Sequence, residues 1–305
     1  MATVALLVNP ARRDAAALAD EAAGWLEGSG HSARVLHLAP AARAEGRVPA
    51  GELSGADLSG ADVAVSLGGD GTFLRLVPLA YSARVPVLGV NFGRVGYLLE
   101  VQPDQLNAAL SRTLDGGTAI EERIVLAVTV TGTLTPATGD DRSLPGDGWV
   151  CPSENRWWVA LNEMVVEKTV PGHMVSLATA VDGEELLTYK ADGVLIASPT
   201  GSTAYNLSAG GPVLAPDLSA MVLTPVAPHL AIDRSLVLRA DQVATIRVLP
   251  SRPAVLVIDG REAGRLAPGA LVTCRVAPQR LQVVSPTDRG FAGPLRRVLT
   301  LRDRT

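Results

Sequence analysis

Cysteine, lysine and long apolar runs are scarce in this sequence, and their scarcity excludes several classes of protein. The chain has 2 cysteines far apart, Cys151 and Cys274, and 4 scattered histidines, so we expect no zinc or iron–sulfur site. No apolar run reaches the ~18 residues that a membrane-spanning helix needs, so we expect no membrane span. The only lysines are Lys168 and Lys190, which we attribute to genome bias because Ala and Gly are abundant.

The remaining composition is that of a soluble globular protein. Of 305 residues, 47% are apolar and 19% charged, enough for one large domain or two ordinary ones. The net charge of −4 disfavours nucleic acid as a partner, since binding phosphates needs a basic surface. The opening MATVALLVNP lacks a basic region, so we expect a first strand there, no signal peptide, and a cytoplasmic location.

The pattern of apolar residues changes after residue 115. Before it, strand-like runs alternate with helical ones, which predicts βαβ units and a parallel sheet. After it, short strands separated by turns predict a mainly-β domain. We therefore expect an α/β domain over 1–115 and a β-rich domain over 116–287, with the tail 288–305 returning to the first. The polar segment 135–155 is expected to be a hairpin extension or a mobile loop. The early strands are predicted at 3–8, 33–38, 62–67 and 85–90, and the helices at 14–27, 73–81 and 103–114.

The stretch LGGDGTF, at residues 67–73, joins a predicted strand to a predicted helix. In a parallel sheet, ligands bind at the carboxyl ends of strands, and glycines let backbone N–H groups approach phosphate oxygens. A carboxylate there needs a purpose, such as holding Mg²⁺ or accepting a proton from an attacking hydroxyl. The alternative is a plain turn with Asp70 as a helix N-cap. No Walker loop is present, because neither lysine follows a glycine, and the GSGHSA stretch at 28–33 is read as helix termination.

A second stretch, ADGVLIASPTGSTAYNLSAGGP at residues 191–212, has the same organisation. A strand runs into a loop of small hydroxyl residues and then into an expected helix from Ala204, which suits an anionic or polyol ligand. Tyr205 adds a surface for stacking. The alternative is a capped loop rich in Ser and Thr.

Together with VPVLGVNFGRVGYLLE, ALNE, LTPVAPH and VIDG, these stretches resemble the NAD kinase family over nearly the whole chain. GGDGT alone is shared with diacylglycerol and sphingosine kinases, whereas its combination with SPTGSTAY is more specific. The resemblance implies a Rossmann-like α/β domain of the NAD kinase/diacylglycerol kinase type and a mainly-β sandwich domain that binds NAD. It also implies Mg²⁺-dependent transfer of a phosphoryl group from ATP or polyphosphate to the 2′-hydroxyl of the adenosine ribose of NAD. This activity serves NADP biosynthesis, in a homodimer or homotetramer.

The same resemblance implies roles for individual residues. Asp70 would be the catalytic base and would also contact NAD, with the phosphates lined by its neighbours. Mg²⁺ would be carried by the phosphates, without an assigned protein ligand. Asn162 and Glu163 would hold a ribose, although a plain strand-end turn is the alternative reading of that pair. The phosphate-lining residues would be Gly68, Gly69, Gly71 and Thr72, and the NAD-binding residues Asp70, Gly71, Phe73, Asn162, Glu163, Lys190, Asp192, Thr203, Ala204, Tyr205 and Ser208.

The chain departs from the family pattern at residues 228–238, where PHLAIDRSLVL replaces PHSLS-x-RPLVL. Three alternatives to an NAD kinase follow from the residues. One is a kinase of the same fold that acts on another nucleoside or polyol. Another is a lipid kinase of the diacylglycerol type, which would bind vesicles. The last is a non-catalytic NAD sensor, which the presence of Asp70 disfavours.

Overall fold

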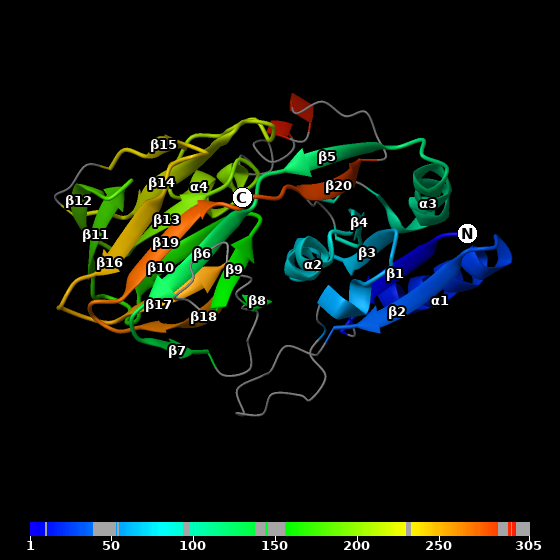
Figure 1. Cartoon of the computed structure of the whole chain (residues 1–305), viewed down its shortest axis with the longest axis horizontal. Coiled ribbons are helices and arrows are strands. Elements are labelled where there is room, and N and C mark those ends of the chain that lie inside the picture. Colours follow the sequence, from blue (N-terminus) through cyan, green and yellow to red (C-terminus); the bar gives the residue numbers. More distant parts are fainter. Residues whose placement is uncertain are drawn as a thin grey trace. The chain divides into compact units, whose positions relative to one another are not determined.

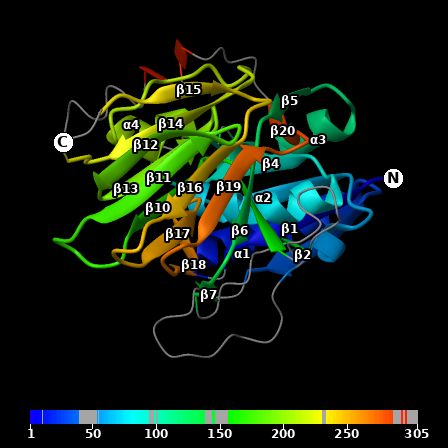
Figure 2. The same cartoon turned by 60° about the vertical axis from the view of Figure 1, so that its left-hand side comes forward.

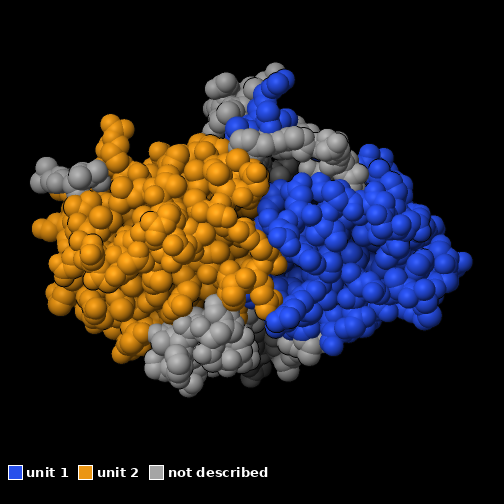
Figure 3. All heavy atoms as spheres, turned by 45° about the horizontal axis from the view of Figure 1, so that its top comes forward, with its two compact units in different colours: residues 1–45, 49–123, 281–305 blue, residues 46–48, 124–280 orange. Residues whose placement is uncertain are grey.

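The computed structural model divides into two compact units (Figure 3). Unit 1 comprises residues 1–45, 49–123 and 281–305, and unit 2 comprises residues 46–48 and 124–280. Among the helices of the described residues, none has the length and apolarity needed to cross a membrane. The structure describes residues 1–9, 11–38, 53, 55–93, 98–99, 101–137, 144–145, 156–229, 233–285, 292–293 and 295–296.

Unit 1 is built on a six-stranded sheet with the order β2-β1-β3-β4-β20-β5 (Figure 1). The pairs from β2 to β20 are parallel, and only β5 runs antiparallel to its neighbour. The inner strands β1 and β3 are almost wholly apolar, as strands buried on both faces must be. The strands are β1 (Thr3–Val8), β2 (Ser32–His37), β3 (Val63–Gly68), β4 (Val87–Asn91), β5 (Ala119–Arg123) and β20 (Leu281–Ser285).

Helices cover both faces of this sheet. Apolar residues of α1 and α3 share one core cluster with alternate residues of β1, β3 and β4. The helix α2 lies on the opposite face, next to η1, and keeps Pro78 within its length. The helical segments are α1 (Arg13–Gly28), η1 (Gly55–Leu58), α2 (Asp70–Ala83), η2 (Pro103–Gln105) and α3 (Leu106–Leu114).

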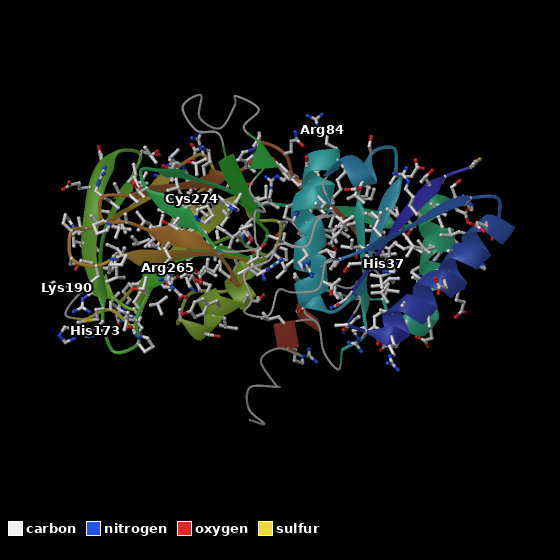
Figure 4. All side chains as sticks on the ribbon, turned by 90° about the horizontal axis from the view of Figure 1, so that it is seen from below. His37, Arg84, His173, Lys190, Arg265 and Cys274 are labelled. Carbon is white, nitrogen blue, oxygen red and sulfur yellow. The ribbon has the colours of Figure 1, made fainter. Side chains whose placement is uncertain are left out.

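Unit 2 is a sandwich of two antiparallel seven-stranded sheets. The first has the order β15-β14-β13-β10-β17-β18-β7, with β10, β13 and β17 side by side (Figure 2). The second has the order β12-β11-β16-β19-β6-β9-β8. Both contribute to one apolar core, which contains the buried free Cys274 (Figure 4). The first sheet comprises β7 (Leu134–Pro136), β10 (Glu163–Lys168), β13 (Gly193–Ala197), β14 (Ala220–Val226), β15 (Leu236–Arg239), β17 (Ala254–Ile258) and β18 (Arg261–Leu266). The second comprises β6 (Leu126–Thr131), β8 (Leu144–Pro145), β9 (Arg156–Ala160), β11 (Val175–Val181), β12 (Glu184–Ala191), β16 (Ala244–Val248) and β19 (Leu271–Val276).

The alternation of side chains along β10 decides which residues leave the core. Met164 and Val166 point into the sandwich, so Glu163, Val165 and Glu167 share the opposite face. After β13, the short segments η3 (Gly201–Thr203) and α4 (Tyr205–Ser208) follow. The carboxylates of β10 therefore belong to the outer face of the first sheet.

The expected bounds differ from the observed ones in two places. The predicted change of domain at 115/116 falls before β5, and the predicted return at 288 falls after β20. Both strands pair within the sheet of unit 1, so the units meet in sequence at 123/124 and 280/281. Most of the tail 288–305 and of the polar segment 135–155 lies outside the described residues.

Candidate active site

The GGDGT segment lies at the carboxyl end of β3, where the chain enters α2. Gly68 ends β3, and Asp70 is the first residue of α2. The N-cap position belongs to Gly69, without a side-chain capping bond, so the reading of Asp70 as an N-cap is wrong. Thr72 and Phe73 donate their N–H groups to Gly69 O at 2.9 and 3.1 Å. Because the first N–H groups of a helix lack partners within the helix, this start favours an anion.

The glycines of this segment differ in what surrounds them. A Cβ at Gly68 would overlap the side chain of Thr72, so packing within the chain requires glycine there. A Cβ at Gly69 or Gly71 would meet no described atom within 4 Å, and neither residue has a positive φ. The chain's own packing therefore explains Gly68 alone. Gly69 and Gly71 leave the start of α2 bare, which lets a ligand approach the backbone closely.

Two residues before α1 reach the same edge of the sheet. Asn9 Nδ2 donates to Thr72 Oγ1 at 3.4 Å. Arg12 Nη2 donates to Phe92 O at 3.2 Å, and its guanidinium lies 5.2 Å from the centroid of the Phe92 ring. The sequence prediction missed both residues. Their place near GGDGT could have been inferred from the topology, because β1 and β3 are parallel neighbours whose carboxyl ends coincide.

The side chain of Phe73, in the first turn of α2, packs toward β4. Only 1% of its surface is exposed, and a Cβ at Gly89 of β4 would lie 3.1 Å from the Phe73 ring. Phe73 thus fills the space above Gly89 and offers almost no surface within unit 1. Its expected contact with adenine stays a prediction.

In unit 2, Asn162 directly precedes β10 and Glu163 is its first residue, and both are buried. The backbone N–H groups of Leu161, Asn162 and Glu163 donate to the carboxylate of Asp259 at 2.9, 2.8 and 3.2 Å. Ser198 N donates to Asn162 O at 2.8 Å. Partners from two other segments thus hold the backbone of this pair.

The environment of Glu163 changes its charge. Burial, and then the negative charge of Asp259, raise the pKa of Glu163 to about 8, although a hydrogen bond from the Tyr205 backbone N–H opposes the shift. Oε2 of Glu163 is buried and has no hydrogen-bond partner among the described residues. At neutral pH the carboxyl group therefore largely keeps its proton. A protonated carboxyl offers one donor and one acceptor, which matches a pair of adjacent hydroxyls.

The loop from Ser198 to Thr203 packs against this pair. Ser198 Oγ donates to Leu161 O and accepts the N–H of Gly201 at 3.1 Å. A Cβ at Gly201 would overlap the backbone of Asn162, so only glycine permits this approach. The SPTG segment therefore fixes the loop directly against the start of β10.

The remaining residues expected in this loop differ in exposure. Thr203 is buried, and its hydroxyl donates to Thr200 O at 3.1 Å. Ala204 is half-buried, whereas Ser208 is exposed. Tyr205 is 37% exposed and is the member with a large surface to offer a ligand. The structure thus brings Asn162, Glu163 and Tyr205 together within unit 2.

Carboxylates surround the Tyr205 side chain. Burial, followed by the negative charges of Glu167, Asp192 and Glu163, raises the pKa of the Tyr205 hydroxyl. Lys168 Nζ forms an ion pair with Asp192 Oδ1 at 2.6 Å and so supplies a positive charge to this group. The sequence prediction did not name Lys168.

Lys190 lies elsewhere in unit 2. It is exposed on β12, in the second sheet (Figure 4), whereas Glu163 begins a strand of the first sheet. Its neighbours Tyr189 and Ala191 are buried, as the alternation of a strand requires. The structure does not bring Lys190 together with Asn162, Glu163 and Tyr205, and its role with NAD stays a prediction.

Asn206 was also missed by the sequence prediction. It is fully buried, and its Nδ2 donates to Ser202 O at 3.1 Å and Pro212 O at 2.9 Å. Its Oδ1 accepts the Thr224 hydroxyl at 2.7 Å, and a Cβ at Gly211 would overlap the same amide. Asn206 therefore ties α4 to β14. The NLSAGG stretch could have indicated this role of Asn206, because an amide followed closely by two glycines suits such close packing.

No group of three or more His, Cys, Asp or Glu side chains that could hold a metal gathers within the described part of the chain. Magnesium in phosphoryl-transfer sites is held by one or two carboxylates and by the phosphates themselves. Asp70, at the start of α2, supplies a carboxylate of this kind. A carboxylate and nucleotide phosphates are oxygen donors that suit a Mg²⁺ ion bound to the nucleotide.

The fold matches solved structures of kinases. A crystal structure of yeast NADH kinase complexed with NADH superposes with a TM-score of 0.78 at 22% identity, covering 98% of this chain and 88% of that one. An NAD kinase from Archaeoglobus fulgidus in complex with ATP gives a TM-score of 0.69 at 23% identity, with 96% and 98% covered. The chain therefore has the two-domain fold of dinucleotide kinases.

Sequence comparison identifies the family. The ATP-NAD kinase N-terminal domain model matches residues 4–118, and the C-terminal domain model matches residues 161–285. The NAD kinase of Symbiobacterium thermophilum is 36% identical over 301 residues, covering 98% of this chain and 99% of the relative. The NAD kinase of Chlorobium limicola is 34% identical over 296 residues, covering 96% and 94%. The chain belongs to the NAD kinase family, and NAD kinase activity (EC 2.7.1.23) is the activity of its relatives.

Proposed function

We propose that this chain transfers a phosphoryl group from ATP or polyphosphate to the 2′-hydroxyl of the adenosine ribose of NAD, giving NADP. The observation that carries the proposal is the start of α2, where Asp70 stands between Gly69 and Gly71 and a Cβ at either glycine would meet no described atom within 4 Å. The complexes of the relatives support the choice of substrates, since the archaeal NAD kinase holds ATP and the yeast enzyme holds NADH.

In this proposal Asp70 accepts the proton of the attacking hydroxyl. A ribose hydroxyl is a weak acid, so its proton must leave as the new oxygen–phosphorus bond forms. The backbone N–H groups at the start of α2, with Gly68 and Thr72 beside them, hold the transferred phosphate. Positioning and charge stabilisation supply most of the remaining catalysis in phosphoryl transfer.

The NAD-binding part of the proposal rests on unit 2. Glu163, protonated at neutral pH, and Asn162 bind a ribose through its two hydroxyls. Tyr205 stacks on a planar part of NAD, and Asp192, paired with Lys168, contacts the nicotinamide end. The proposal requires that NAD held by these residues present its 2′-hydroxyl to Asp70. The further contacts proposed for NAD are Gly71, Phe73, Lys190, Thr203, Ala204 and Ser208.

A divalent cation, Mg²⁺ in this proposal, would be carried by the substrate phosphates, without an assigned protein ligand. When bound, it neutralises part of the phosphate charge. Asp70 itself remains the group that takes the proton.

The test is an assay of the purified full chain that varies donor, acceptor and metal. ATP and polyphosphate are compared as donors, and NAD, NADH, free nucleosides and sugars as acceptors, with Mg²⁺ or with EDTA. The expected result is NADP from NAD, lost on chelation. Phosphorylation of a nucleoside or sugar in preference to NAD would overturn the proposed acceptor, and full activity in EDTA would overturn the metal requirement.

Two coarser properties complete the proposal. We expect a homodimer or homotetramer, which light scattering coupled to gel filtration measures directly.

We also propose a cytoplasmic location, where both nucleotide substrates are present. Fractionation of the source cells would test it.

A further inference from the structure

Asp259 lies in the turn between β17 and β18 and is not assigned a role by the reaction above. Its side chain is 7% exposed, and its two carboxylate oxygens together accept the N–H groups of three consecutive residues, Leu161 to Glu163. Its own N–H donates to Glu163 O at 3.0 Å. Asp259 thus forms hydrogen bonds with the start of β10 through both its side chain and its backbone.

The turn itself explains only part of this arrangement. Asp259 and Gly260 have φ angles of 47° and 74°, the combination that Asp-Gly satisfies in a two-residue hairpin turn. Asn-Gly satisfies the same turn without a negative charge. The charge disfavours ionisation of its neighbour, because it lies beside Glu163, a second buried acidic group. A residue chosen for the turn alone would not be a buried carboxylate.

We infer that Asp259 is a positioning residue for NAD, which fixes the Asn162–Glu163 pair in the orientation that binds the ribose. It acts through the three N–H groups of residues 161–163 and makes no contact with substrate in this inference, which rests on the proposed role of Asn162 and Glu163. A hydrogen bond to a charged acceptor is stronger than one to a neutral group, so a carboxylate holds this backbone more firmly than an amide would.

The chain contains a matched control in Asp182. It also precedes a glycine in a hairpin turn, with a φ of 52°, and its carboxylate accepts the N–H of Val243 at 2.8 Å. Its own N–H donates to Val243 O at 2.8 Å, just as Asp259 N donates to Glu163 O. Asp182 is exposed in the β11–β12 turn, so its replacement tests an Asp-Gly turn without the Asn162–Glu163 pair.

The experiment compares Asp259→Asn with Asp182→Asn in the full chain, measuring the thermal midpoint, kcat and both KM values. An amide at position 259 keeps one acceptor oxygen and turns an NH₂ group toward backbone donors. We expect the KM for NAD to rise about tenfold or more, with the KM for the phosphate donor unchanged within about twofold. Asp182→Asn should change neither KM.

The pH profile separates positioning from general loss of structure. The groups that face Glu163 are the carboxylate of Asp259, from the β17–β18 turn, and the backbone N–H of Tyr205, from α4. Beyond Tyr205 lie Glu167 and Asp192, the latter paired with Lys168. Removing the Asp259 charge lets Glu163 ionise at lower pH, so the transition in the KM for NAD should move toward acid. An unmoved transition with equal losses in both KM values would overturn the inference.

Glu163→Ala and Asn162→Ala distinguish failure of the inference from failure of the proposed function. If these variants leave the KM for NAD unchanged, the ribose assignment fails. If they raise it while Asp259→Asn does not, Asp259 has no positioning role. If Asp259→Asn does not fold, Asp259→Ser, which keeps a single acceptor, is measured for the same selective rise. Failure of both variants to fold would make Asp259 purely structural and overturn the inference.

Discussion

Gly68 and Thr72 pack so closely at the end of β3 that residue 68 has no room for a side chain. The same does not hold for Gly69 and Gly71, where a Cβ would meet no atom of the described residues within 4 Å. This difference separates a glycine that the fold requires from glycines that only a ligand would require.

We expect Gly71→Ala to keep or improve stability while lowering turnover. Alanine in a helix is favoured over glycine by about 0.5–1 kcal/mol. A methyl group beside the phosphate should nevertheless reduce turnover by roughly tenfold or more, since small displacements of reacting groups are costly. Thermal melts and steady-state kinetics measure the two effects.

The control for Gly71 is Gly24→Ala in α1, where a Cβ also meets no described atom within 4 Å. It should gain similar stability without loss of turnover. Equal turnover in both variants would mean that no ligand approaches Gly71. Gly68→Ala, by contrast, should destabilise the protein because of the overlap with Thr72.

For Asp70→Asn we expect a folded protein that binds NAD but loses at least about a hundredfold in turnover, because an amide cannot accept the proton. The weakened interaction between the carboxylate and the helix start should cost about 0.3–1 kcal/mol of stability. Single-turnover kinetics with ATP and NAD give the rate of the chemical step.

Asp104→Asn provides the comparison for Asp70, because Asp104 lies in the first turn of η2. It should show the same small change in stability and normal turnover. Near-normal turnover in Asp70→Asn would remove the catalytic role.

The raised pKa of Glu163, about 8, predicts a pH dependence of stability. Between pH 4.5 and 8 the unfolded state loses this proton while the folded state keeps it, so stability falls as pH rises. Glu163→Gln mimics the protonated carboxyl and removes this loss. The thermal midpoint of the variant, relative to the original chain, should therefore increase from pH 5 to pH 8.

Differential scanning fluorimetry over this pH range is sufficient, with Glu185→Gln on the exposed part of β12 for comparison. That variant should show no such trend. A difference between Glu163→Gln and the original chain that is constant with pH would contradict the raised pKa.

Asn206→Ala should destabilise unit 2. The substitution removes two bonds donated by the amide and leaves the Thr224 hydroxyl without the acceptor Asn206 Oδ1. Unsatisfied buried groups cost about 1–3 kcal/mol each, so urea unfolding should shift clearly. Leu207→Ala in the same helix, at a half-buried position, should shift it less. Comparable shifts would mean that the amide network contributes little.

The sequence predicted the elements whose signal is local. The runs at 3–8 and 62–67 fall on β1 and β3 within a residue, because apolar runs bounded by turn residues define buried strands. The start of α2 was placed at 73 and lies at Asp70, since glycine and aspartate disfavour helix interiors but are tolerated in a first turn. In the structure Lys190 is exposed on β12, as alternation along that strand predicts, and Lys168 is the lysine that pairs with Asp192.

Other properties depend on distant partners and could not be predicted. The protonation of Glu163 depends first on its burial and then on the charge of Asp259, 96 residues further along the chain. Residues 281–285 were recognisable as apolar, yet only pairing with β4 and β5 assigns them to the sheet of unit 1. Neither the contact of Glu163 with Asp259 nor the pairing of residues 281–285 produces a pattern in the neighbouring sequence.

The place of β20 has a consequence for synthesis on the ribosome. When residue 123 emerges, the sheet of unit 1 lacks the strand that separates β4 from β5, and the whole of unit 2 must be made before that strand appears. The part of the β4 edge around Val87 stays unpaired during this interval, whereas Val90 already pairs with Val101, and unpaired strand edges are prone to wrong pairing. A chain truncated before residue 281 cannot complete this sheet, because it lacks the strand between β4 and β5.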